Sequence, residues 1–392
     1  MKKNCVIIIP GIPYPPVDGH KLKIYNLILI LSKHYDLHII TISKENLSTE
    51  QVDFIDKHSY KSKHFKIRSI ATLFRLFKSI FSGIPFQVGY FTFSSIKRYL
   101  LNNSQNDTFA VLNLVRTCEY LDVLSNKYIV LDMVDSLSKS YLKSNETTSS
   151  RLYSLIYGIE GKRLVEYEKK CLSKANLTLC VNQEDAMNLS SCGNVKWLPN
   201  GVNASLFNYT KRDDDYNDYI VFFGAMFYQP NVDAMIWFDK YVLDHLDPNI
   251  KVVVIGARPS TSILNIAKKR INVKVTGFLD DPYSIINSCF AVIAPMQNGG
   301  GIQNKILESM GMGKVNILTS YAADPIVGAE NNKHFIVEND PTIMAKKINE
   351  VYRFPSSFFK MGDDAAMLIK SRYTWEAYEE QIISQLNEQN ND

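Results

Sequence analysis

The sequence of 392 residues lacks the features that mark several functional classes. Its six cysteines show no two-residue spacing of the kind that holds zinc or a redox pair, so we expect buried, reduced thiols. The 44 basic residues face 40 acidic ones, and a net charge of +4 excludes the broad positive surface of a nucleic-acid-binding chain. No uncharged apolar run approaches the ~20 residues that cross a bilayer. We therefore expect a cytoplasmic protein that is soluble or peripheral to a membrane.

The first half of the chain has the pattern of a doubly wound α/β sheet. Residues 6–9 form a continuous apolar run, too short for a signal peptide and typical of a strand buried on both faces. A glycine-containing loop, a helical pattern over residues 22–31 and an apolar strand over 37–42 follow. Further strands are predicted over residues 109–115, 128–132 and 177–180, and a long helix over about 150–173.

The second half alternates strands and helices almost regularly, which predicts a second doubly wound domain. A polar run over residues 211–218 lies near the junction of the two patterns. We predict domains over residues 1–200 and 201–374. The expected strands cover residues 219–223, 252–255, 273–276, 291–294, 315–318 and 334–337; the expected helices cover about 233–245, 262–269, 283–288, 302–310 and 342–351.

Three consecutive glycines, Gly299, Gly300 and Gly301, connect a buried strand to a helix. Glycine lets backbone N–H groups approach a ligand, and the start of a helix adds unpaired donors, so this turn suits phosphate. Lys305 in the first helical turn can add a positive charge. Glu308 lies three residues further on the same face and can accept hydrogen bonds from sugar hydroxyls.

Spacing alone leaves a second interpretation of this turn open. The glycines can form a flexible loop, and Lys305 and Glu308 an exposed pair worth only a few tenths of a kcal/mol. The segment is not a Walker loop, because no Gly-Lys-Ser/Thr follows the glycines, and it lacks the glycine spacing of the dinucleotide fingerprint.

The glycine segment resembles the nucleotide-sugar site of the family-4 (group 1) glycosyltransferases. That resemblance implies the α/β GT-B fold, in which two Rossmann-like doubly wound domains face a central cleft. It also implies that a C-terminal helix over about 375–390 packs back on the first domain. Four further segments resemble family motifs in the same order along the chain: residues 15–21, 200–203 with Phe207, 224–234 and 277–282.

The sequence departs from the usual family pattern at two points. The family has two glutamates separated by seven residues, and Gly300 stands at the first of these positions. The segment instead resembles a variant in which Gly301, Lys305 and Glu308 form a Gly-x-x-x-Lys-x-x-Glu motif. The loop at Gly224 also lacks the usual basic residue that contacts diphosphate.

The resemblance implies a donor substrate of the UDP- or GDP-sugar type, a reaction that retains anomeric configuration, and no metal or other cofactor. Lys305 then stabilises the diphosphate and Glu308 holds the ribose. The residues expected to contact the donor are Gly19, Gly224, Asn231, Gly299, Gly300, Gly301, Ile302 and Gln303.

The first domain is expected to bind the acceptor, a saccharide or a lipid-linked saccharide of bacterial polysaccharide or glycolipid synthesis. Asp135 follows a predicted strand and, by the resemblance, is a catalytic or acceptor contact. Asp132, Arg116 and His20 are further acceptor candidates. For either aspartate, capping of the following helix is an equally good interpretation.

Residues 61–81 interleave lysines and arginines with isoleucine, leucine and phenylalanine. A basic amphipathic helix of this kind can lie on the inner face of an anionic membrane, although an ordinary surface helix is the alternative. Two other functions also remain open. They are another GT-B enzyme, such as a sugar-nucleotide epimerase or a phosphorylase, and a non-catalytic nucleotide-sugar-binding scaffold.

Overall fold

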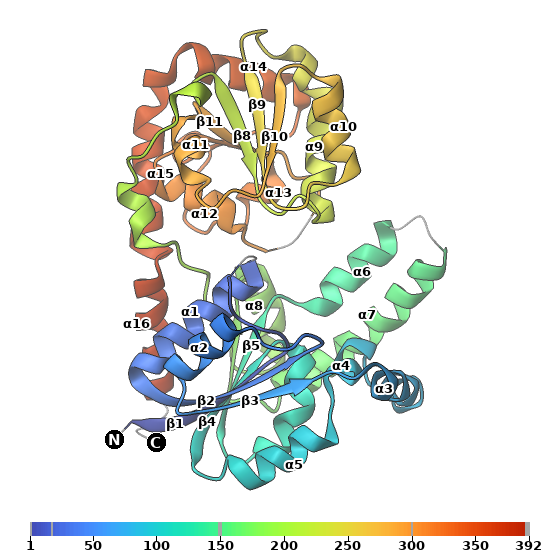
Figure 1. Ribbon diagram of the computed structural model, residues 1–392. Coiled ribbons are helices and arrows are strands. Elements are labelled where there is room, and N and C mark those ends of the chain that lie inside the picture. Colours follow the sequence, from blue (N-terminus) through green and yellow to red (C-terminus); the bar gives the residue numbers. More distant parts are fainter. Residues whose placement is uncertain (1, 17–18, 148–150, 299–300, 389–392) are drawn as a thin grey trace. The chain divides into compact units, whose positions relative to one another are not determined.

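The computed structural model describes residues 2–16, 19–147, 151–298 and 301–388. The chain divides into two compact units, Met1–Leu198 and Pro199–Asp392. Each unit is built on one sheet of parallel strands with helices around it (Figure 1). We describe the two units separately.

The sheet of the first unit has seven strands in the order β3-β2-β1-β4-β5-β6-β7, and every neighbouring pair is parallel. Residues 6–9 of β1 are almost completely buried, as their apolar run predicts. The register aligns Ile7 with Ile39 of β2 and with Val111 of β4. The strands are β1 Lys3–Ile9, β2 Tyr35–Ser43, β3 Lys61–Lys66, β4 Asp107–Asn113, β5 Tyr128–Val134, β6 Leu177–Cys180 and β7 Val195–Trp197.

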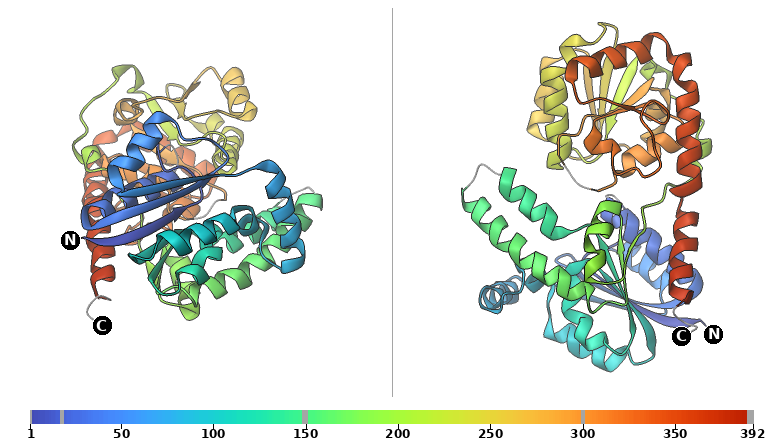
Figure 2. Two further views of the ribbon diagram at one scale, coloured as in Figure 1. Left: turned by 60° about the horizontal axis from the view of Figure 1, so that its bottom comes forward. Right: turned by 180° about the vertical axis from the view of Figure 1, so that it is seen from behind.

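Helices cover both faces of this sheet, with α1 and α2 on one side and α5 on the other (Figure 1). The paired helices α6 and α7 project away from the sheet (Figure 2). The helices are α1 Gly19–His34, α2 Thr49–His58, α3 Ser69–Ser82, α4 Phe86–Phe91, α5 Ser94–Asn103, α6 Leu137–Thr147, α7 Arg151–Leu172 and α8 Gln183–Leu189, with 3-10 helices η1 Val115–Leu124 and η2 Ser190–Cys192.

The sheet of the second unit has six parallel strands in the order β10-β9-β8-β11-β12-β13. Strands predicted over residues 219–223 and 291–294 end where the sequence places them. The strands are β8 Tyr219–Phe223, β9 Lys251–Ile255, β10 Val273–Gly277, β11 Ala291–Ala294, β12 Asn316–Leu318 and β13 Ile336–Val337.

Helices α9, α10, α11, α12 and α14 lie around the sheet of the second unit (Figure 1). The helix predicted over about 375–390 is α16, and its packing on the first domain stays a prediction. The helices are α9 Gln229–Tyr241, α10 Thr261–Lys269, α11 Tyr283–Ser288, α12 Asn304–Gly311, α13 Ser320–Ala323, α14 Pro341–Arg353, α15 Phe359–Arg372 and α16 Trp375–Glu388, with 3-10 helices η3 Ala204–Asn208, η4 Asp214–Tyr216, η5 Leu243–His245 and η6 Pro355–Phe358.

In each sheet, successive strands are first added on one side of the first strand and then on the other, although all strands are parallel. The change of side lies between β1 and β4 in the first unit and between β8 and β11 in the second. In doubly wound sheets, ligands bind outside the carboxyl ends of the strands at this switch point. The loops after these four strands therefore contain the candidate functional residues.

Candidate functional site

The loop that follows β8 in the second unit begins with Gly224, which has a φ of 140°. The Gly224 N–H donates to the Ile255 carbonyl at 3.0 Å, and a Cβ added at this glycine would lie 3.1 Å from Asn231 Nδ2. The Asn231 amide in turn donates to the Ala225 carbonyl at 3.0 Å. The two predicted donor contacts Gly224 and Asn231 thus pack tightly against one another.

Lys305 projects from the first turn of α12 toward these residues. Its Nζ donates to Asn231 Oδ1 at 2.8 Å and lies 3.6 Å from Met296 Sδ. The same nitrogen is 4.0 Å from the centre of the buried Phe222 ring. Among the residues that the structure describes, no carboxylate forms an ion pair with Lys305, so its contacts are an amide oxygen, a thioether and an aromatic face.

These surroundings weaken the charge of the lysine. Desolvation lowers the Lys305 pKa to about 7, because no nearby anion compensates for lost water. A diphosphate beside Nζ would supply the missing negative charge and favour the protonated amine. The position therefore has the electrostatics of an anion site.

Glu308, one turn further along α12, is hydrogen-bonded to the Tyr283 hydroxyl. Burial raises the Glu308 pKa to about 7, and the hydroxyl of Tyr283 opposes that rise by donating to the carboxylate. Lys305 and Glu308 are thus not an exposed helix pair, since each has a partner from elsewhere in the unit. Sequence spacing did not identify Tyr283, Met296 or Phe222.

The start of α12 is fixed by the motif over residues 200–203. Asn200 Nδ2 donates to Asn304 Oδ1, at the first residue of the helix, at 3.0 Å. A Cβ on Gly201 would lie 2.4 Å from the Trp375 nitrogen, and the Val202 N–H donates to the Tyr373 carbonyl at 2.7 Å. The motif therefore holds α12 against the start of α16 within the same unit.

The residues between β11 and α12 are described only in part. Gly299 and Gly300 lie outside the described residues. Gly301 is buried with a φ of 73°, a conformation that glycine adopts without strain. Ile302 and Gln303 precede the helix, which begins at Asn304 and not at residue 302. First-turn N–H groups of a helix lack intrahelical acceptors and are available to a ligand.

A cation that sequence analysis did not identify lies beside the Gly224 loop. The exposed Arg258 follows β9 and has its guanidinium 3.9 Å from the centre of the Phe227 ring. The Met226 N–H donates to the Ala257 carbonyl at 3.2 Å, which ties the two loops together. Arg258 is therefore a second cation at this edge of the sheet.

At the switch point of the first unit, Lys23 and Asp132 form an ion pair in which both side chains are fully buried. Asn113 Nδ2 donates to the second Asp132 oxygen at 2.8 Å. Asn113 Oδ1 therefore faces His20 Nε2, 2.9 Å away, and accepts a hydrogen bond from that nitrogen. Of the predicted acceptor contacts, Asp132 is enclosed by protein partners and His20 is joined to it through Asn113. Gly19 is the first residue of α1.

Asp135 lies just beyond β5 and differs from Asp132. Its Oδ1 is buried without a hydrogen-bond partner among the described residues. Burial and the charge of Asp185 raise the Asp135 pKa to about 6. The preceding Val134 has a φ of 69°, a strained value for a β-branched residue, and such strain is concentrated at functional sites.

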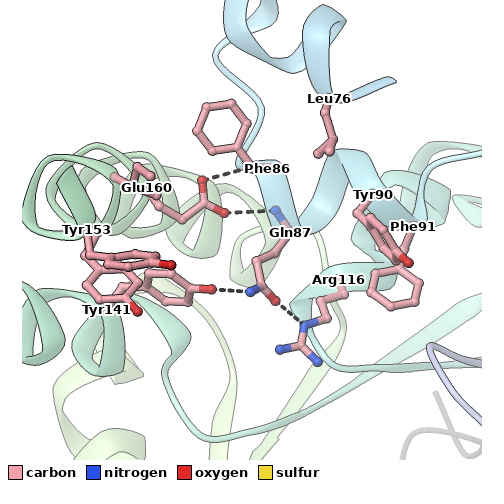
Figure 3. Close-up of a pocket in the computed structure, with 11 residues that line it drawn as sticks. Leu76, Phe86, Gln87, Tyr90, Phe91, Arg116, Tyr141, Tyr153 and Glu160 are labelled. Atoms are coloured by element: carbon pink, nitrogen blue, oxygen red, sulfur yellow. Dashed lines mark hydrogen bonds between the residues drawn. The ribbon is translucent and has the colours of Figure 1, made fainter. Parts of the chain in front are cut away.

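Arg116 was expected to end a strand, but that strand stops at Asn113 and Arg116 lies in η1. The cause is Leu114, whose φ of 61° turns the chain out of the sheet. Arg116 consequently lines a pocket beside α4, α6 and α7 (Figure 3).

The segment over residues 61–81 is not one helix. Residues Lys61–Lys66 form the edge strand β3, which pairs with β2, so their three lysines belong to the sheet. The helix α3 begins at Ser69, and it exposes Phe74, Phe77 and Phe81. No described helix is long and apolar enough to cross a bilayer. Within the described ranges, no group of three or more His, Cys, Asp or Glu side chains is arranged to hold a metal.

Residues 217–353 match the family model of the group 1 glycosyl transferases, and this range includes Gly224, Asn231, Lys305 and Glu308. Over 94% of its length the chain is 24% identical to an uncharacterized 44.6 kDa protein in the cps region of Klebsiella pneumoniae, of which it covers 96%.

Two solved structures are similar over nearly the whole chain. Sucrose-phosphate synthase from Thermosynechococcus elongatus has a TM-score of 0.71 at 14% identity, with 99% of each chain covered. Anabaena Alr3699/HepE in complex with UDP-glucose has a TM-score of 0.66 at 12% identity, with 98% of this chain and 99% of that chain covered. These similarities confirm the predicted fold class, GT-B with two Rossmann-like domains.

Proposed function

We propose that this protein is a retaining glycosyltransferase that moves a sugar from a UDP- or GDP-sugar to a saccharide or lipid-linked acceptor. One observation carries the proposal. The segment that matches the group 1 glycosyl transferases contains a lysine, Lys305, whose partners among the described residues are all neutral and whose side chain lies beside the Gly224 turn. A nucleotide diphosphate is the anion that such a site would bind in this family.

The proposed chemistry follows from charge. As the bond to the anomeric carbon breaks, negative charge develops on the diphosphate leaving group. A donor already aimed at that position stabilises the transition state without reorganising. Lys305 and the first-turn N–H groups of α12 take this role, and Glu308 accepts hydrogen bonds from the ribose. The positive charge at the diphosphate comes from Lys305 and the start of α12, and the proposed reaction uses no metal ion.

Asp135 of the first unit is the proposed contact to the acceptor hydroxyl. Its buried oxygen without a described partner is available to accept that hydroxyl's proton. The Asp135 pKa of about 6 leaves the carboxylate mostly ionised at neutral pH. Asp132 is hydrogen-bonded to Asn113, which in turn is hydrogen-bonded to His20. Its proposed role is therefore to position His20 at the start of α1.

The proposed setting is bacterial polysaccharide or glycolipid synthesis at the inner face of the cell membrane. The relative in the cps region of Klebsiella pneumoniae supports this setting, and the neighbour in complex with UDP-glucose supports the donor class. The exposed phenylalanines of α3 support contact with a membrane surface.

The test is a panel of UDP- and GDP-sugars, scored first by thermal stabilisation and then by nucleotide release in the presence of cell-envelope acceptors. We expect stabilisation by one nucleotide class and release with its sugar. Lys305→Ala should reduce turnover by roughly 10²–10³. Lys346→Ala removes an exposed lysine from α14 and should retain full turnover. Failure of every nucleotide to stabilise the protein would refute the proposal.

One observation favours a second candidate, a non-catalytic scaffold that binds nucleotide sugar. Gly300 stands where the family has its first glutamate, a residue that contacts the transferred sugar. Tight binding of a nucleotide sugar without release on any acceptor extract would favour the scaffold.

A further inference from the structure

A cavity of about 470 Å³ lies in the first unit, where α3, α4, η1, α6 and α7 supply its lining residues (Figure 3). Its size is in the range of small-molecule sites. Six aromatic rings line it, together with Leu76, Ile156 and three polar side chains, Gln87, Arg116 and Glu160. The rings belong to Phe86, Tyr90, Phe91, Tyr141, Tyr153 and Tyr157.

Arg116 is held in one orientation at this cavity. Its Nε donates to Gln87 Oε1 at 2.7 Å, and the Gln87 amide nitrogen donates to the Tyr141 hydroxyl. No described residue accepts a hydrogen bond from the two terminal nitrogens of the guanidinium. Such a fork, fixed at Nε and open at both ends, matches the paired oxygens of a phosphate.

Glu160 is the only carboxylate among the lining residues, and its charge is already engaged. Its two oxygens accept the backbone N–H groups of Phe86 and Gln87 at 2.8 and 2.9 Å. The glutamate is 1% exposed, and it forms no ion pair with the Arg116 guanidinium. The lining therefore contains one carboxylate that already accepts two hydrogen bonds and one cation, Arg116, whose terminal nitrogens have no described acceptor.

Apolar side chains surround this charge and continue onto the surface. Helix α7 supplies Ile156 to the wall and exposes Leu152 and Leu155. Helix α3 supplies Leu76 and exposes Phe77 and Phe81, by 59% and 77%. Exposed apolar groups on two elements that share a cavity are typical of a binding surface for an apolar partner.

The two helices are tied to each other by Arg163 of α7. Its terminal nitrogens donate to the carbonyls of Ser79 and Ile80 of α3, each at 3.0 Å. A Cβ on Gly89 of α4 would lie 1.9 Å from Ser79 Oγ, so α3 and α4 are also in close contact. The helices that supply the apolar walls are therefore held in place by contacts within the unit.

We infer that this cavity is the headgroup site for a lipid-linked acceptor. Arg116 binds the phosphate next to the lipid, and the aromatic rings enclose the first part of the hydrocarbon chain. The exposed apolar side chains of α3 and α7 contact the remainder of that chain. The inference rests on the proposed function, and it specifies the acceptor class as a lipid phosphate. A free acidic saccharide would leave the exposed apolar groups of both helices without a partner.

Calorimetric titration of the full chain tests the two requirements separately. The probes are geranyl phosphate, geraniol, which lacks the phosphate, and glucose 1-phosphate, which lacks the chain. We expect geranyl phosphate to bind at least tenfold more tightly than either of the others. Equal binding of geraniol would overturn the role of the phosphate, and equal binding of glucose 1-phosphate would overturn the role of the lipid.

Variants locate the binding. Arg116→Gln should weaken geranyl phosphate at least tenfold and leave geraniol unchanged. Ile156→Asp, at a position that is 39% exposed and tolerant of a polar side chain, should weaken geranyl phosphate and leave glucose 1-phosphate unchanged. Arg98→Gln makes the same charge change on an exposed part of α5 and should have no effect. Unchanged binding of geranyl phosphate in both test variants would overturn the site.

Titration with UDP- and GDP-sugars in the same preparations separates this inference from the proposed function. Arg116→Gln should bind donor as the unaltered protein does. Donor binding without geranyl phosphate binding would refute the lipid site alone, whereas loss of donor binding in the unaltered protein would refute the glycosyltransferase proposal.

Discussion

Each unit places one lysine near its switch point, and the two lysines have opposite surroundings. Lys23 forms an ion pair with Asp132, and neither side chain is exposed. Asn113 completes the bonding of that carboxylate. Lys305 instead meets an amide oxygen, a sulfur and an aromatic ring. One charge is neutralised within the protein, and the other has only neutral contacts.

This contrast separates a structural charge from a functional one. A buried charge without a counter-ion destabilises a fold, and such a charge within a predicted ligand site is a candidate for function. In the first unit, Lys23 and Asp132 neutralise each other and leave no net charge for a ligand. In the second unit, burial without a counter-ion lowers the Lys305 pKa to about 7. The experiments below alter one side of this contrast at a time.

The largest expected effect is on stability in the first unit. Asp132→Asn leaves the buried Lys23 ammonium without its ion-pair partner, which should lower the free energy of unfolding by about 3–5 kcal/mol. Hydrogen exchange of the β4 and β5 amides across a urea series measures this value for the unit alone. Asp36→Asn, at an exposed position of β2, should change it by less than about 0.5 kcal/mol.

A double variant checks the cause of that loss. Lys23→Met combined with Asp132→Leu removes both charges and should recover most of the stability. Asp132→Asn stability equal to that of Asp36→Asn would show that the pair does not stabilise the unit.

The equivalent change in the second unit should have the opposite sign. Lys305→Met removes a poorly solvated ammonium and retains its apolar stem, so the free energy of unfolding should rise. One pKa unit corresponds to about 1.4 kcal/mol, and we expect a gain of at least this size. The lowered pKa fixes the pH range in which Lys305 destabilises the folded protein. This destabilisation grows as pH falls from 10.5 toward 7, where Lys305 is fully protonated in the unfolded chain only.

Urea unfolding of Lys305→Met at pH 7 and pH 10 measures this gain, with Lys346→Met on α14 as the control. The gain should be larger at pH 7. A loss of stability at pH 7 would mean that Lys305 has a structural role like that of Lys23.

Local sequence patterns predict some elements of this fold well and others poorly. The strands at 219–223 and 291–294 and the helix at 283–288 are apolar segments bounded by polar or turn residues, and their limits were predicted correctly. Strand β3, Lys61–Lys66, was missed because it lies at the sheet edge, where a polar sequence can pair on one side only. Helix α6, Leu137–Thr147, was also not predicted.

The same limit applies to the candidate site. Lys305 and Glu308 are three residues apart on one helix, so spacing could place them together. Their partners Asn231 and Tyr283 come from other elements, and only the fold brings them near. Sequence could not separate Asp132 from Asp135 either, because the difference is a lysine 109 residues away in the chain.

The third expected effect is a pH dependence of donor binding. The Lys305 pKa is about 7 without ligand, so higher pH leaves the amine neutral. A nucleotide sugar does not titrate between pH 7 and 8.5, and its affinity should fall by up to about tenfold for each pH unit in this range. Calorimetric titration at several pH values measures this limb. Lys305→Met should bind the nucleotide sugar weakly, and its affinity should not fall over this pH range. A fall that persists in this variant would mean that another group titrates.

The smallest expected effect concerns the acidic side of the same profile. The Tyr283 hydroxyl donates to Glu308 and favours its ionised form, which the proposed ribose contact requires. Tyr283→Phe removes this bond, so the Glu308 pKa should rise further above 7 and the acidic limb should move to higher pH by about one unit. Donor titrations between pH 5.5 and 8 measure the shift. Tyr241→Phe, at an exposed position of α9, should leave the profile unchanged. A shift to lower pH in Tyr283→Phe would exclude Glu308 as the group whose ionised form binds the donor, because loss of a hydrogen-bond donor can only raise the pKa of that carboxyl.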